Sequence, residues 1–124
     1  DMALGGISAM KKLAERLPSW REAQDWQWCA RFGYQIIEKR GTGGGGFRFL
    51  YRDFLMEAEA LIPELRPLSL SDTMDTIARQ WTEISNILKL ASENGHHSLF
   101  EQAGRMVGEV ANREKEFYRL VLSL

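Results

Sequence analysis

The clearest helical pattern in this chain lies in residues 98–124, which read SLFEQAGRMVGEVANREKEFYRLVLSL. One set of positions recurs there in alternating steps of four and three, and all of them are apolar except one glutamate: Ala103, Val107, Val110, Glu114, Phe117, Val121 and Leu124. This spacing places the set along one face of an α-helix. Ser98 and Glu101 match a capping box, which predicts the start of that helix.

The preceding segment repeats the same spacing at Ile77, Trp81, Ile84, Leu88 and Ala91. It predicts a helix that is capped by Ser71 or Asp72, runs to about Glu93 and is closed by Asn94 and Gly95. Two such seams in succession are typical of antiparallel helices packed in a bundle.

Two glycines, Gly104 and Gly108, lie one turn apart beside the seam of the last helix. Glycine inside a helix costs up to about 1 kcal/mol relative to alanine. We therefore expect a neighbouring helix backbone to approach closely at these positions.

The rest of the chain also predicts helices: residues 7–17, then 19–40 after a capping box at Ser19 and Glu22, then 47–61. No stretch alternates apolar and polar residues as a strand does. The sequence therefore predicts an all-α fold, a bundle of four to five helices that are mostly antiparallel. A glycine-rich loop separates the second helix from the third.

Composition indicates one soluble globular domain over residues 1–124, with 44% apolar residues, 27% charged residues and a net charge of −1. The basic residues are dispersed, which argues against nucleic-acid binding. No apolar run is long enough to span a bilayer. The single cysteine, Cys29, suits a reducing compartment, so we expect a cytoplasmic protein. The chain begins with Asp1, and we expect a C-terminal fragment of a longer two-domain protein.

The glycine run covers residues 41–46, and Arg48 and Tyr51 follow in the next helix. Arginine in a first turn opposes the helix dipole unless an anion is bound there. The candidate contact site, for a ligand or another domain, comprises Gly43, Gly44, Gly45, Arg48 and Tyr51. It is no Walker loop, because a helix precedes it and no lysine follows. The anion is a carboxylate of this domain or an external ligand, or else the run is only a loop beside a solvated arginine.

Glu114 occupies an otherwise apolar seam, and a buried carboxylate must be paired, hydrogen-bonded or protonated. Three hypotheses stay open. The seam turns Glu114 to solvent, or Glu114 forms a buried ion pair with Arg48 or with Arg79, or it is catalytic together with Tyr51. Arg48 and Glu114 are the candidate ion pair.

The third predicted helix has two distinct faces. Arg48, Tyr51 and Leu55 share one face, and beside it runs an apolar stripe of Phe47, Leu50, Phe54, Ala58 and Leu61. Elsewhere, Cys29 has no histidine near it, and the adjacent His96 and His97 point in different directions. We therefore predict no catalytic residue, no metal site and no cofactor.

The glycine run and the residues after it resemble a known family. Its motif here comprises Gly41, Thr42, Gly43, Gly44, Phe47, Arg48, Tyr51, Phe54, Leu55, Glu57 and Ala58. Together with Gly6, Ile7, Trp20, Trp81 and Glu114, these residues resemble the C-terminal domain of unknown function in proteins whose N-terminal half is like butirosin biosynthesis protein H. The resemblance covers almost the whole chain.

The resemblance implies a helical accessory domain, in secondary metabolism, of a cysteine-type acyltransferase or peptidase-like protein. Its partners would be the N-terminal catalytic domain of the same protein or an acyl carrier protein. The catalytic half is absent here, and Cys29 does not replace its nucleophile. The alternative is a stand-alone helical interaction module, and an enzyme in its own right is the third hypothesis.

Overall fold

The computed structural model describes residues 10–31 and 45–124, and every regular element within them is helical. The elements are the short 3₁₀ helices η1 (Leu17–Glu22) and η2 (Pro63–Leu68) and the α-helices α3 (Gly45–Leu61), α4 (Leu70–Asn94) and α5 (His97–Leu122). Residues 10–16 and 26–31 are also α-helical. The predicted all-α class is therefore confirmed for the described residues.

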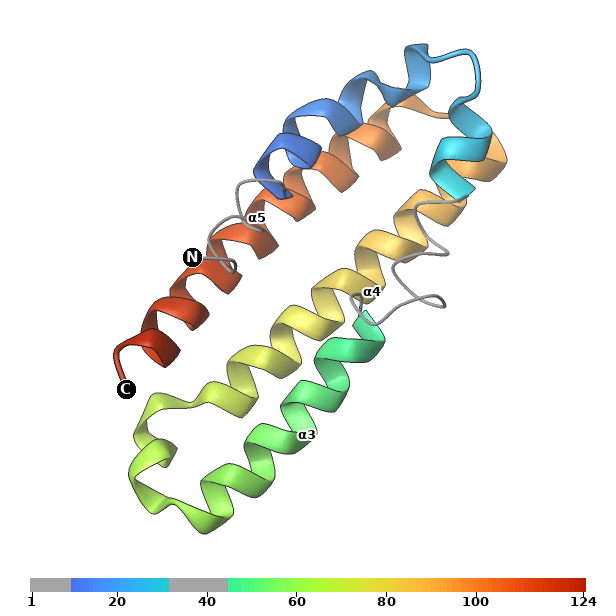
Figure 1. Cartoon of the computed structure of the whole chain (residues 1–124). Coiled ribbons are helices and arrows are strands. Elements are labelled where there is room, and N and C mark those ends of the chain that lie inside the picture. The colour runs from blue at the N-terminus through green and yellow to red at the C-terminus, as the bar shows by residue number, and fades with distance from the viewer. Residues whose placement is uncertain (1–9, 32–44) are drawn as a thin grey trace.

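The two longest helices form a hairpin. α4 and α5 lie side by side and run in opposite directions (Figure 1). The turn between them uses Gly95, which has a φ of 71° and donates its N–H to the carbonyl of Ala91 at 2.8 Å. Only glycine adopts this left-handed conformation at little cost, so the predicted helix stop at Asn94 and Gly95 is confirmed.

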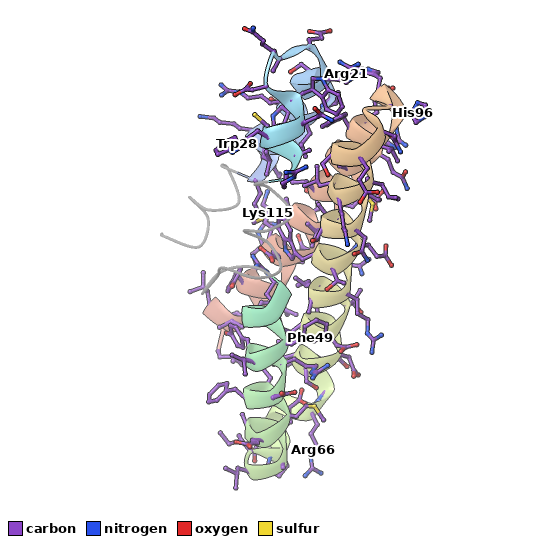
Figure 2. The ribbon with its side chains drawn as sticks, turned by 90° about the vertical axis from the view of Figure 1, so that its right-hand side faces the viewer. Arg21, Trp28, Phe49, Arg66, His96 and Lys115 are labelled. Carbon is purple, nitrogen blue, oxygen red and sulfur yellow. The ribbon has the colours of Figure 1, made fainter. Side chains whose placement is uncertain are left out.

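Two shorter segments pack against this hairpin. α3 packs along the N-terminal half of α4 (Figure 1). Residues 10–22 pack against α5 toward the other end of the molecule. Figure 2 places Arg21 and His96 at one end of the molecule and Arg66 at the opposite end. Most of the two seams meets in one core with residues of the other elements: Leu17, Leu55, Leu70, Met74, Ile77, Trp81, Ile84, Leu88, Ala103, Val107, Val110 and Phe117. Ala91 packs instead with Ala30 and Phe100 in a second, smaller cluster.

The close approach expected at the two glycines of α5 occurs at one of them. A methyl group built on Gly104 would lie 2.7 Å from the carbonyl oxygen of Ala14, whereas one built on Gly108 meets only the Ala14 Cβ, at 3.7 Å. The expectation is therefore confirmed for Gly104 and wrong for Gly108, where alanine fits.

The capping box predicted at Ser19 is wrong. Ser19 lies inside η1, and its hydroxyl donates to the carbonyl of Arg16 at 2.8 Å instead of capping a new helix. Pro18 favours this short 3₁₀ turn, because it starts a helix well and cannot continue one. The predicted helix over 19–40 is interrupted at residues 23–25, and its residues 32–40 lie outside the described residues, as do residues 7–9 of the first helix.

Other predicted boundaries shift by one or two residues. The capping box at Ser98 is wrong, since α5 begins at His97 and no side chain caps its start, while Glu101 Oε1 lies 3.5 Å from the His97 side chain. α4 begins before Ser71, because the Ser71 hydroxyl donates to Glu59 of α3. A tertiary contact thus takes the group that a local cap would use.

Candidate functional site

Glu114 is the charged group in the centre of the structure. It lies on the buried seam of α5 and is 2% exposed, so the hypothesis that the seam turns it to solvent is wrong. Its Oε1 atom accepts hydrogen bonds from the Arg48 guanidinium of α3 and from Trp81 Nε1 of α4, the latter at 3.0 Å. Side chains of α3 and α4 therefore both bind the carboxylate that α5 carries.

The arginine of this cluster lies in the early part of α3. Its guanidinium carbon is 4.9 Å from the centre of the Trp81 ring, which adds a cation–π contact to the ion pair with Glu114. The Arg48 side chain keeps 18% of its surface exposed. The positive charge of Arg48 opposes the dipole at the start of α3, and Glu114 is its counter-ion. The anion that a first-turn arginine predicts is therefore a carboxylate of this domain.

The second arginine considered for Glu114 lies elsewhere. Arg79 Nε pairs with Asp75 Oδ2 at 2.7 Å within α4, and the Arg79 side chain is 70% exposed. Asp75 also binds Arg52 of α3 through Oδ1 and Arg52 Nη1, at 2.7 Å. These hydrogen bonds from Arg52 and Arg79 hold the pKa of Asp75 below its usual range. The spacing of Asp75 and Arg79, four residues apart on one helix, was a signal for this pair.

Two tyrosines complete the surroundings of the cluster. Tyr51 packs edge-on against Phe117, with ring centres 5.7 Å apart, and Phe117 packs likewise against Tyr118 at 5.1 Å. Burial raises the pKa of Tyr51, and burial followed by the charge of Glu114 raises the pKa of Tyr118. Tyr51 is thus held by aromatic packing, on the same side of α3 as Arg48.

The glycines of the predicted contact site are placed only in part. Gly43 and Gly44 lie outside the described residues, and Gly45 is the first residue of α3. Of the predicted set, the structure brings Arg48 and Tyr51 to the inner side of α3. The described residues contain no group of three or more side chains that could hold a metal ion.

Three large side chains of the predicted apolar stripe of α3 face outward. Leu50, Phe54 and Leu61 are 69%, 63% and 82% exposed, whereas Leu55, on the face that packs against the hairpin, is 5% exposed. We call Leu50, Phe54 and Leu61 the α3 stripe. Sequence periodicity located this stripe but did not show that α3 directs a partly charged face inward.

Raising the pH should destabilise the fold through Tyr118. Because the folded-state pKa is raised, the stability that neutral Tyr118 contributes is complete below the unfolded tyrosine pKa and is lost as the pH rises through the folded one. Tyr118→Phe keeps the ring and cannot ionise, so it should lose less stability at alkaline pH than the wild type. Denaturant midpoints across the alkaline range measure this, and identical pH profiles for the two proteins would contradict it.

The fold and this cluster define a small helical domain whose buried polar groups join its helices. The chain belongs to the family described as Domain of unknown function (DUF4872), whose sequence profile matches residues 1–121. A search of curated proteins and a search of solved structures each found no significant match. Among the described helices, none is long and apolar enough to cross a bilayer.

Proposed function

We propose that this chain is a non-catalytic accessory domain of a butirosin biosynthesis protein H-like, cysteine-type acyltransferase or peptidase-like protein. In this proposal a bundle of mostly antiparallel helices docks on the catalytic half, and the docking surface is the α3 stripe. The observation that carries the proposal is the exposure of Leu50, Phe54 and Leu61 on one helix face. Apolar side chains gathered on a surface mark interaction sites in soluble proteins.

The Glu114 cluster supports the non-catalytic part of this proposal. A general acid or base must come within hydrogen-bond reach of its substrate. The Glu114 side chain is 2% exposed, and its Oε1 atom already accepts from Arg48 and Trp81. This geometry suits a carboxylate that holds helices together.

The same stripe favours one alternative, a stand-alone helical interaction module. The two proposals differ in what precedes the domain. An upstream domain with a cysteine and histidine pair supports the accessory domain, and an acyl carrier protein would then be a further partner. A reading frame without such a domain would leave only the alternative.

The accessory proposal is tested by mixing the upstream domain, produced as a separate chain, with residues 1–124. We expect the two to co-elute in size-exclusion chromatography, and Phe54→Ser to weaken their affinity about tenfold or more by removing a central apolar contact. Leu90→Ser is the matched control, because Leu90 is 48% exposed near the other end of α4. No association of the two chains, or equal effects of the two variants, would overturn the proposal.

A further inference from the structure

The rotation of α3 about its own axis is set by polar contacts on its inner face. Three of its side chains bind groups of α4 and α5: Arg48 binds Glu114, Arg52 binds Asp75 and Glu59 binds Ser71. Rolling α3 to bury its stripe would break all three contacts and leave Glu114 buried without its arginine. The α3 stripe is therefore exposed because of how the domain is built.

One edge of the α3 stripe is acidic. An α-helix turns about 100° per residue, so Asp53 and Glu57 lie on the same side of the stripe. Asp53 pairs with Arg52 at 2.7 Å, whereas Glu57 is exposed and has no ion pair within residues 10–31 and 45–124. A partner covering the stripe would bring apolar groups and a negative charge together, which favours a cation opposite Glu57.

We propose that the α3 stripe binds an amphipathic helix of a partner domain, whose apolar side chains are flanked by lysine or arginine that pairs with Glu57. This inference rests on the proposed docking function and gives the partner its chemistry. A helix is the matching shape because the stripe spans Leu50 to Leu61 in steps of four and seven, the spacing of a helix–helix seam.

A second copy of this chain fits the stripe less well. In an antiparallel pair of α3 helices, the edge that carries Glu57 faces the same edge of its partner, and like charges meet. In a parallel pair it faces the edge that carries Ala58. Neither arrangement supplies a cation, and an anionic membrane surface would also repel this edge.

The test uses two synthetic helical peptides of about 18 residues, or five turns, with the same leucine face. One peptide carries lysine and the other glutamate on both flanks of that face. Fluorescence anisotropy gives the Kd of each peptide for residues 1–124 and for the variants Glu57→Lys and Phe54→Ser. Glu93→Lys, which makes the same charge change at an exposed site near the end of α4, is the control.

We expect the lysine peptide to bind the wild type about tenfold more tightly than the glutamate peptide. Glu57→Lys should reverse this order, Phe54→Ser should weaken both peptides, and Glu93→Lys should preserve the wild-type order. Equal binding of the two peptides, or an unchanged order in Glu57→Lys, overturns the inference. So does a dimer in analytical ultracentrifugation that Phe54→Ser abolishes, or binding to phosphatidylglycerol vesicles without peptide binding.

The two proposals can fail separately. If the upstream domain associates with this chain but the peptides do not distinguish charge, only the basic helix is lost. If the lysine peptide binds as expected but the upstream domain does not, the stripe keeps its chemistry and the accessory role is lost.

Discussion

Replacing Arg48 with alanine is expected to lower the free energy of unfolding by about 3 kcal/mol, because it leaves a buried carboxylate without its cation. Glu114 is 2% exposed, and Trp81 Nε1 would still donate a neutral hydrogen bond to its Oε1 atom. The value lies at the low end of the range for broken buried pairs, since the 18% exposure of the Arg48 side chain lets water approach. Urea unfolding followed by circular dichroism measures the loss.

The matched control for this experiment is Arg79→Ala. Arg79 also pairs with a carboxylate, Asp75, but its side chain is 70% exposed, so its removal should cost less than about 1 kcal/mol. Arg48→Met combined with Glu114→Gln removes both buried charges and keeps an amide oxygen for Trp81, so this double variant should recover most of the stability. Equal losses for Arg48→Ala and Arg79→Ala would show that the buried pair does not hold the helices together.

The second large effect is expected at Gly104, where alanine should destabilise the domain by about 2 kcal/mol. The added methyl group would lie 2.7 Å from the carbonyl oxygen of Ala14 and 3.1 Å from Pro18 Cδ. A backbone oxygen cannot move aside as a flexible side chain can, so residues 10–22 would have to shift away from α5.

At Gly108, one turn later on the same helix, we expect an alanine substitution to have the opposite effect on stability. A methyl group there would make only an ordinary contact, 3.7 Å from Ala14 Cβ. Gly108→Ala should therefore stabilise the domain by up to about 1 kcal/mol through helix propensity. Thermal unfolding of the two variants beside the wild type measures both changes, and shifts of the same sign would contradict the close approach at Gly104.

The sequence was most informative where one periodic pattern extended over many turns. The seams became the facing sides of α4 and α5 from Ile77 to Leu88 and from Ala103 to Phe117, since a buried apolar face can be satisfied only by another such face. The last predicted position of the second seam, Leu124, is 71% exposed. The capping boxes predicted at Ser19 and Ser98 were wrong because each rested on two residues rather than on a pattern repeated over many turns. A cap depends on a few local hydrogen bonds, and Pro18 or a side-chain contact is enough to change them.

The polar cluster could be predicted only as a set of alternatives. An acid in an apolar seam demanded a partner, and an arginine in a first turn demanded an anion. Whether Arg48 or Arg79 was that partner depended on how α3 crosses the hairpin. The spacing of the two seams does not predict this crossing. Arg48 and Glu114 lie on helices that are separated in the sequence by the whole of α4, although they are in contact in the fold.

By itself, the sequence determined the all-α class, the α4–α5 hairpin and the need to neutralise Glu114. Helical periodicity and a glycine stop depend only on residues close together in the sequence, and a buried charge is costly in any fold. The tertiary structure decided which arginine pairs with Glu114, at which glycine of α5 residues 10–22 approach closely, and which face of α3 is exposed to solvent. These depend on distances between segments far apart in the chain. The physical reason is that α3 can make its polar contacts to α4 and α5 only by leaving Leu50, Phe54 and Leu61 outside.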